Sequence, residues 1–264
     1  IGTEGAPIQE LTHAVTVSDE FMEAMIDGDS DKRQRWAKVI QRRGEIGYPY
    51  IMFTDTMNKK APDVYKDRGA KITHSNLCSE IALADSSDES FVCVLSSMNV
   101  LHYDEWKDTD AVETMVYFLD SVVSEFLTKL ETIRDNGTPE GKKAFEFMER
   151  AYNFAKRQRA LGLGVLGWHS YLQSKMLGFD TRETAKLNVE VFKLIQQKSY
   201  AASEELAAKF GEPEYLKGIG RRNVTLNAIA PTTSSAFILG QVSQSIEPLW
   251  SNCYVKDLAK MKVT

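Results

Sequence analysis

The chain has 264 residues, of which 43% are hydrophobic, 10% aromatic and 26% charged, a composition that supports a large core and excludes disordered and fibrous classes. A net charge of −5 argues against a nucleic-acid binder. The sequence contains neither an apolar run of about 18 residues, which a membrane helix needs, nor the pattern of a signal peptide. Three cysteines are too few for a disulfide scaffold, so we expect a reducing, cytoplasmic setting.

The N-terminal part is predicted to contain two helices and one strand. Residues 1–17 carry no clear period and are expected to be irregular. Ser18 and Ser30 are suitable helix N-caps, the second for a basic helix that ends at Gly44. Residues 48–53 then form a short apolar run, which is typical of a buried strand.

The middle of the chain is predicted to contain a short strand at 91–95 and two amphipathic helices. Apolar residues recur at helical spacing from Asp110 to Ile133, and Asn136-Gly137 ends this helix. Thr138-Pro139 starts the next one, because proline at the first helical position lacks only an N–H that would have no partner there. Its inner face is expected to carry Phe145, Met148, Tyr152 and Ala155.

The C-terminal part combines a glycine-rich segment, a long helix and a strand. Glycines in residues 161–167 would each cost about 1 kcal/mol against alanine on a helix face, so close backbone packing must offset them. A helix is predicted from Asp180 to Phe210, closed by Gly211 and Pro213, and residues 224–230 alternate as a strand. Strands between long helices indicate one α/β unit with parallel strands, part of a barrel.

Asn76, Cys78 and Glu80 occupy alternate positions. If this segment is extended, the three side chains project to the same side of the chain. An amide, a redox-capable thiol and a proton-accepting carboxylate would then share one pocket. A solvated loop with a buried structural cysteine is the alternative interpretation.

The other cysteines and the histidines carry weaker signals. Cys93 falls in the predicted strand 91–95, where an inner-face cysteine is the simplest interpretation. A zinc site built from His74, Cys78 and Cys93 is conceivable, but no Cys-x2-Cys or His-x3-His pair supports it. We interpret His102 and His169 as histidines with satisfied hydrogen bonds or at the surface, and Cys253 as a structural residue.

Residues 231–235 (PTTSS) form a hydroxyl-rich turn between the predicted strand 224–230 and the apolar residues 236–239, which can be helical. Backbone N–H groups and hydroxyls at a helix N-terminus favour an anion, because the unpaired donors and the helix dipole both point at it. A hydroxyl cap without a ligand is the alternative. Residues 244–248 are expected to form a loop that closes over this turn.

Together, these segments resemble the large (α) subunit of class I ribonucleotide reductase. Each motif is weak alone, but their order and spacing over residues 30–250 are specific. The glycine-rich segment and the residues after it are most similar to bacterial and T4-type phage versions. The motifs are residues 75–81 (SNLCSEI), 93–97 (CVLSS), 159–167 (RALGLGVLG), 222–226 (RNVTL), 231–235 (PTTSS) and 245–248 (SIEP).

The resemblance implies an α/β fold that is part of the ten-stranded α/β barrel of this family, with a central finger loop and long outer helices. Cys78 matches the cysteine that becomes a thiyl radical and removes the 3′ hydrogen of the ribose. Glu80 matches the carboxylate that takes the 3′-hydroxyl proton, and Asn76 matches the amide that holds this hydroxyl. Cys93 matches one of two thiols that reduce the 2′ carbon and end as a disulfide.

The same resemblance implies the substrate and its binding residues. The expected reaction reduces ribonucleoside diphosphates to 2′-deoxyribonucleoside diphosphates for DNA synthesis. Thr233, Ser234 and Ser235 match the turn that binds the substrate diphosphate. Ser75 and Pro231, beside the two motifs, are the remaining expected substrate-binding residues.

The residue types fit radical chemistry. Acid–base catalysis alone does not break a C–H bond at an unactivated sugar carbon, whereas the S–H bond of a thiol is comparable in strength to that C–H bond. Burial protects a sulfur radical from solvent and oxidation. We therefore expect the Cys78 sulfur to be shielded, close to Cys93 and to the serine turn. A thiol pair supplies the electrons and must be reset by thiol–disulfide exchange.

The resemblance also implies partners. No cofactor or metal is expected to bind this chain directly, because a dimetal small (β) subunit supplies the radical. Thioredoxin or glutaredoxin is expected to reduce the disulfide, and nucleotide effectors to bind outside this region. We expect a homodimer in the cytoplasm, with no nucleic-acid or membrane partner.

Residues 1–264 are interpreted as a single catalytic-barrel region, a fragment or split half of a longer α subunit. No cysteine precedes Cys78 to serve as the second reducing thiol of the family. The radical-relay tyrosines, C-terminal thiols, specificity loops and ATP cone of the family also have no match here. We therefore expect the chain to be inactive alone and to need the remaining part of the α subunit.

Two alternatives to this interpretation stay open. An adenosylcobalamin-dependent class II reductase shares the Asn-x-Cys-x-Glu motif and a hydroxyl-rich turn, and dependence on cobalamin would identify it. A non-catalytic nucleotide-binding scaffold would keep the same fold without the chemistry. Replacement of Cys78 by serine would abolish turnover in a reductase and leave a scaffold unaffected.

Overall fold

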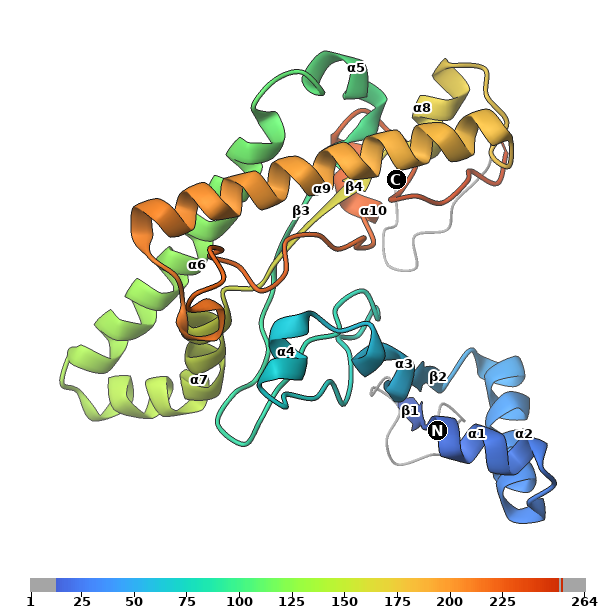
Figure 1. Cartoon of the computed structure of the whole chain (residues 1–264), viewed down its shortest axis with the longest axis horizontal. Coiled ribbons are helices and arrows are strands. Elements are labelled where there is room, and N and C mark those ends of the chain that lie inside the picture. Colours follow the sequence, from blue (N-terminus) through green and yellow to red (C-terminus); the bar gives the residue numbers. More distant parts are fainter. Residues whose placement is uncertain (1–12, 252, 254–264) are drawn as a thin grey trace, which may run out of the picture.

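Long helices and short parallel strands make up the computed structural model, which describes residues 13–251 and residue 253 (Figure 1). The strands are β1 (Ala14–Val17), β2 (Tyr50–Phe53), β3 (Val94–Asn99) and β4 (Leu161–Leu166). The helices are α1 (Asp19–Ile26), α2 (Ser30–Ile46), α3 (Thr54–Lys59), α4 (Asp63–Asp67), α5 (Tyr103–Trp106), α6 (Ala111–Asp135), α7 (Pro139–Gln158), α8 (Trp168–Ser174), α9 (Arg182–Phe210) and α10 (Thr233–Ile238), with 3-10 turns at Val100–His102 and Glu214–Leu216.

The three long helices confirm the sequence periodicity. α6 ends at the predicted Asn136, and α9 ends at Gly211. α7 begins after Thr138, whose hydroxyl accepts the N–H of Gly141 at 3.0 Å. The predicted inner face of α7 is buried at Phe145, Tyr152 and Ala155, with Met148 partly buried beside it. This core stabilises the helices because it removes their apolar faces from water.

The N-terminal region differs from the prediction in three details. Residues 14–17, expected to be irregular, form β1, which pairs in parallel with β2. β2 is half-buried rather than buried. α2 is capped by Asp29, which accepts the N–H of Lys32, and continues past Gly44 to Gly47, whose φ of 77° suits glycine. In Figure 1 these elements lie at one end of the molecule, away from α6 and α9.

The glycine-rich segment is a strand, not a helical face. β4 is buried along its whole length and pairs in parallel with β3, which begins at Val94 rather than at residue 91. A Cβ at position 162 would collide with the Leu95 side chain, and one at position 164 with the carbonyl oxygen of Ala228. The predicted close backbone packing is therefore present, but it occurs between extended segments.

Residues 224–230 run along the other side of β4 without forming a regular strand. A single parallel bridge joins Leu163 to Asn227. The hydroxyl of Thr225 donates to the carbonyl of Leu161 at 3.1 Å, and the Asn227 amide donates to that of Leu163 at 3.3 Å. Side chains thus take the place of part of the backbone ladder, which is why the predicted strand is irregular.

The two largest of three apolar clusters among the described residues hold these layers together. The larger lies between α6, α7, α9 and the β3–β4 sheet. The smaller packs residues 61–84 against α7 and the start of the 224–230 segment. Among the described helices, none has the length and apolar character needed to cross a bilayer.

Candidate active site

The segment 75–81 is a tight loop closed by Asn76. Its side-chain oxygen accepts the N–H of Ile81 at 3.0 Å, and its backbone carbonyl accepts the N–H of Ser79 at 3.2 Å and the hydroxyl of Ser75 at 2.9 Å. Ser79 has a φ of 67°, which turns the chain. The extended conformation that would project Asn76, Cys78 and Glu80 to one side is therefore wrong, because the Asn76 amide is used to close the loop.

A pocket of about 360 Å³ lies between this loop, the β3–β4 sheet and the turn before α10. Four of the predicted site residues line it: Cys78, Glu80, Pro231 and Ser235. Five others do not: Ser75, Asn76, Cys93, Thr233 and Ser234. The fold therefore brings a thiol, a carboxylate and the hydroxyl-rich turn to one cavity, although they are far apart in the sequence.

Cys78 is exposed, contrary to the expectation that its sulfur is shielded. It lies at the tip of the 75–81 turn, and within residues 13–251 the strands form two separate two-stranded sheets rather than a closed barrel. The described part of the chain therefore leaves the Cys78 side chain open to solvent.

Glu80 has a buried carboxylate oxygen, Oε2, with no hydrogen-bond partner within the described residues. A buried polar atom without a partner is unfavourable unless a ligand or proton satisfies it. Since Glu80 also lines the pocket, this oxygen is available to accept a hydrogen bond or a proton there.

Cys93 is a free thiol that directly precedes β3. A Cβ on Gly162 would lie 3.2 Å from its sulfur, so the missing side chain makes room for the thiol. Burial, and next the charge of Glu80, raise the pKa of Cys93 to about 12. The thiol is therefore protonated at neutral pH, and Glu80 lies within electrostatic reach of it.

The hydroxyl-rich turn forms the start of α10. The backbone N–H groups of Thr233, Ser234 and Ser235 donate to no acceptor in the described part of the chain. The hydroxyl of Thr232 does not cap them, because it accepts the N–H of Ser245 at 2.7 Å. The Thr233 hydroxyl donates to the Gln244 side chain at 2.9 Å. The expected contact between the 244–248 loop and this turn is therefore present.

The structure also places the residues of the zinc alternative, the two other histidines and the third cysteine. Residues 13–251 and 253 contain no group of three His, Cys, Asp or Glu side chains that could hold a metal ion, so the zinc alternative has no ligand set there. His102 is exposed and pairs with Glu105 at 2.9 Å, and His169 accepts the N–H of Leu249 at 2.9 Å, as expected for such residues. Cys253 is exposed and lies outside the pocket.

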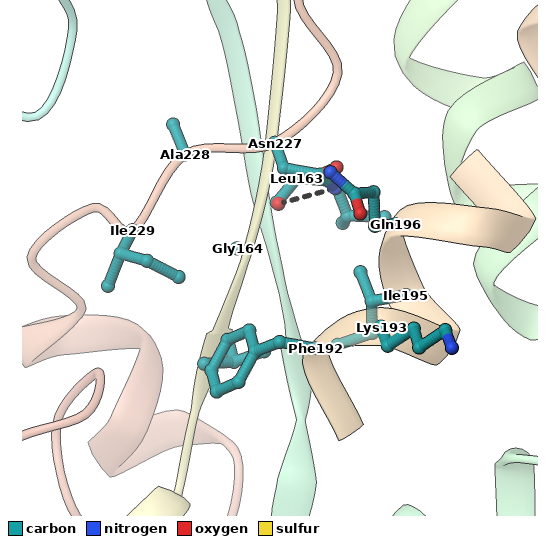
Figure 2. A pocket seen from close by; sticks show the side chains of 10 residues that line it. Leu163, Gly164, Phe192, Lys193, Ile195, Gln196, Asn227, Ala228 and Ile229 are labelled. Carbon is teal, nitrogen blue, oxygen red and sulfur yellow. Dashed lines mark hydrogen bonds between the residues drawn. The ribbon is translucent and has the colours of Figure 1, made fainter. Parts of the chain in front are cut away.

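A second cleft, of about 380 Å³, lies between α9 and residues 227–229 (Figure 2). Its walls include the side chains of Phe192, Ile195 and Ile229, and Figure 2 shows the Asn227 amide bonded to the Leu163 carbonyl at its edge. No predicted site residue lines it. The cleft is therefore separate from the candidate active site.

Sequence reasoning missed several residues that build the pocket. Leu95, Ser96 and Ser97 of β3 line it, and the two adjacent serines in an otherwise apolar strand are the signal that was available.

Comparisons with known proteins point to one family. The model for the barrel domain of ribonucleotide reductase matches residues 29–218 and 213–264. The ribonucleoside-diphosphate reductase large subunit of Invertebrate iridescent virus 3 is 35% identical over 223 residues, which are 84% of this chain and 33% of that protein. The corresponding subunit of Danio rerio is 30% identical and covers 84% of this chain and 30% of its own length.

The fold comparison agrees. The solved class Id ribonucleotide reductase alpha subunit of Actinobacillus ureae is 54% identical, with a TM-score of 0.88, over 97% of this chain and 47% of that chain. This chain thus spans less than half the length of the relatives it matches.

Proposed function

The chain belongs to the ribonucleotide reductase barrel-domain family, and from this premise we propose that it forms the substrate-reducing pocket of a class I ribonucleoside-diphosphate reductase α subunit. One observation carries the proposal. Cys78, Glu80 and two residues of the hydroxyl-rich turn, Pro231 and Ser235, line a single pocket, although they come from distant parts of the sequence. A thiol, a carboxylate and an anion-binding turn, together with a reducing thiol pair, are the groups needed to reduce a ribonucleoside diphosphate to its 2′-deoxy form.

The turn would bind the diphosphate of the substrate. The unpaired N–H groups of Thr233, Ser234 and Ser235, with the Ser234 and Ser235 hydroxyls, supply donors for phosphate oxygens. Pro231 lines the pocket just before these donors, and Ser75 belongs to the loop that carries Cys78 and Glu80. With the phosphates at the turn, the ribose would extend along the pocket toward Cys78 and Glu80.

Cys78 and Glu80 would then activate the ribose. A radical-generating partner subunit oxidises the Cys78 thiol to a thiyl radical. The thiyl takes a hydrogen atom from C3′, which restores the S–H bond and leaves a carbon radical. Glu80 accepts the 3′-hydroxyl proton on its unpartnered oxygen, which helps expel the 2′ hydroxyl. Asn76 would act here through the loop that it closes.

Cys93 and a second thiol would supply the electrons. Together they give two electrons and two protons: one proton leaves with the 2′ hydroxyl as water, and the other hydrogen ends on C2′. The two sulfurs join as a disulfide, Cys78 returns its hydrogen atom to C3′, and Glu80 returns its proton to the 3′ oxygen. A protonated Cys93, which its raised pKa favours, suits this role because the leaving hydroxyl needs a proton.

The other components are proposed from the family. They are a dimetal small (β) subunit as radical source, thioredoxin or glutaredoxin as reductant, and nucleotide effectors that bind elsewhere. The remaining part of the α subunit would supply the second thiol and cover the exposed Cys78, which a radical requires. We further propose that the α subunit is a homodimer that works in the cytoplasm.

The test compares two cysteine variants in an assembled reductase that contains these residues, the remaining α-subunit segments and a radical-generating subunit. Cys78→Ser is expected to abolish deoxynucleotide formation while leaving binding of a ribonucleoside diphosphate intact. Cys253→Ser is the matched control and should keep wild-type turnover, since this exposed thiol lies outside the pocket. Turnover by Cys78→Ser, or a strict need for adenosylcobalamin, would refute the proposal.

A further inference from the structure

A buried carboxylate, Asp120 on α6, binds residues from two other segments. It is 3% exposed. Its Oδ1 accepts Arg159 Nε at 2.8 Å and Asn223 Nδ2 at 2.9 Å. Its Oδ2 accepts Arg159 Nη2 at 2.8 Å and Arg222 Nε at 3.0 Å. These four donors use the acceptor capacity of the carboxylate. We call Asp120, Arg159, Arg222, Asn223 and Ser203 the clasp.

The clasp fixes the starting points of two segments relative to each other. Arg159 lies just before β4, and Asn223 just before the segment 224–230. The Asn223 amide also donates to the backbone carbonyl of Arg159 at 3.0 Å. Ser203 of α9 accepts the backbone N–H groups of Arg222 and Asn223, each at 3.1 Å. The clasp therefore joins α6 and α9 to the starts of the two extended segments, with the Asp120 carboxylate bonded to both segments.

Both segments run from the clasp to the pocket. Two backbone hydrogen bonds join them. The N–H of Leu161 donates to the carbonyl of Thr225 at 3.0 Å, and the N–H of Leu163 donates to the carbonyl of Leu226 at 2.8 Å. At the far end they deliver Leu166 and the 231–235 turn to the cavity that Cys78 lines. Because the 224–230 segment has only one regular bridge, its register depends on a few polar contacts. A slip of one residue would move the turn by about 3.3 Å.

The clasp depends on the negative charge of Asp120, which pairs with Arg159 and Arg222. Burial alone would raise the pKa of Asp120, but the hydrogen bonds and charges of Arg159 and Arg222 outweigh burial and lower it. The carboxylate is therefore ionised at neutral pH and faces two guanidinium groups. A neutral amide of the same shape would keep the volume and lose this bidentate pairing.

We propose that Asp120 is a positioning residue, which sets the register of the 224–230 segment against β4 and so the place of the 231–235 turn relative to Cys78. This inference rests on the proposed function, since it concerns the same pocket. Asp120 itself would not contact substrate. Its effect would reach the site through the two extended segments.

The experiment measures kcat and KM for a ribonucleoside diphosphate in the assembled reductase carrying Asp120→Asn. We expect kcat/KM to fall by about 100-fold or more, because a displacement of only about 1 Å at a reacting centre already has this effect, with part of the loss in KM. A fraction of unfolded enzyme would lower kcat and leave KM unchanged, so a higher KM separates positioning from mere stability.

Val116→Ala is the matched control, because Val116 is buried on the same helix and carries no polar group. It should lower the melting temperature and leave KM at the wild-type value. If Asp120→Asn does not assemble, Asn223→Ala is the second variant, because it removes the hydrogen bonds of Asn223 to Asp120 and to the Arg159 carbonyl. It should also raise KM, by a smaller factor than Asp120→Asn. A wild-type KM in these clasp variants, with kcat reduced only in proportion to folded protein, would overturn the proposal. If Cys78→Ser stays inactive in the same preparation, that result rejects the clasp alone and not the proposed function.

Discussion

The polar groups near the two ends of β4 differ in whether they have hydrogen-bond partners. At the clasp, every oxygen of Asp120 has partners, and the Ser203 hydroxyl holds two backbone N–H groups. At the pocket, one oxygen of Glu80 has no partner in the described residues, and the first N–H groups of α10 are unpaired. Saturated groups hold a structure, whereas unsaturated ones in a cavity are available to a ligand. This difference distinguishes the clasp, which positions the two extended segments, from the pocket, which holds the groups proposed to react.

Removal of the Glu80 carboxylate should have the largest effect on the pocket end. Glu80→Gln keeps the shape but cannot accept the 3′-hydroxyl proton, so kcat should fall by about 10²–10⁴ with little change in KM. Steady-state kinetics of the assembled reductase measures this. Glu146→Gln, a change at an exposed residue of α7 outside the pocket, is the control. Near-normal kcat in Glu80→Gln would mean that the unpartnered oxygen has no catalytic role.

The thiols of Cys93 and Cys253 should differ strongly in their rates of alkylation. A pKa of about 12 instead of 9.0 leaves Cys93 with about 1000-fold less thiolate at pH 8, because each unit is a factor of ten. Alkylation followed by mass spectrometry should therefore modify the exposed Cys253 well before Cys93. The Cys93 rate should keep rising with pH toward 12. Unfolded protein, in which the thiols become alike, is the control, and equal rates in the native protein would contradict the account.

Loss of a donor at the turn should have a smaller effect. Ser235→Ala removes a hydroxyl that would face a charged phosphate, and such hydrogen bonds contribute about 1.5–3 kcal/mol. KM for the diphosphate should rise about tenfold or more, with kcat largely kept. Ser121→Ala, whose hydroxyl bonds only to the Tyr117 carbonyl of its own helix, should leave KM unchanged. An unchanged KM in Ser235→Ala would place the phosphates elsewhere.

Amide hydrogen exchange sharpens the comparison with the smallest perturbation. The N–H groups of Arg222 and Asn223 have an acceptor in Ser203, so they should exchange slowly. Those of Ser234 and Ser235 have none within residues 13–251 and should exchange quickly. Addition of a ribonucleoside diphosphate should slow the second pair only. Equal exchange at both ends would remove the distinction drawn here.

The helices could be predicted from the sequence because their signals are local. The apolar spacing of α6, the Thr138-Pro139 start of α7 and the Gly211 end of α9 all occur within a few residues of the feature they specify. β1 could not, because its four residues gain their partner from β2, more than thirty positions away. The glycine-rich strand was mistaken for a helical face, since glycine removes the side-chain period on which such a prediction relies.

The site was predicted in its chemistry and not in its geometry. The motifs identified Cys78, Glu80 and the serine turn, which one pocket brings together. The orientation of Asn76 was wrong because its side chain closes a turn, and a sequence pattern of alternate polar residues fits both a strand and such a loop. The exposure of Cys78 depends on what lies opposite the loop, which these residues alone do not contain.

A structure of the assembled reductase with a bound ribonucleoside diphosphate tests the central claim most directly. The account predicts the phosphates on the N–H groups of residues 233–235 and ribose C3′ within about 3.5 Å of the Cys78 sulfur, the separation of a reacting pair. Phosphates bound away from this turn, or a ribose that points away from Cys78, would contradict it.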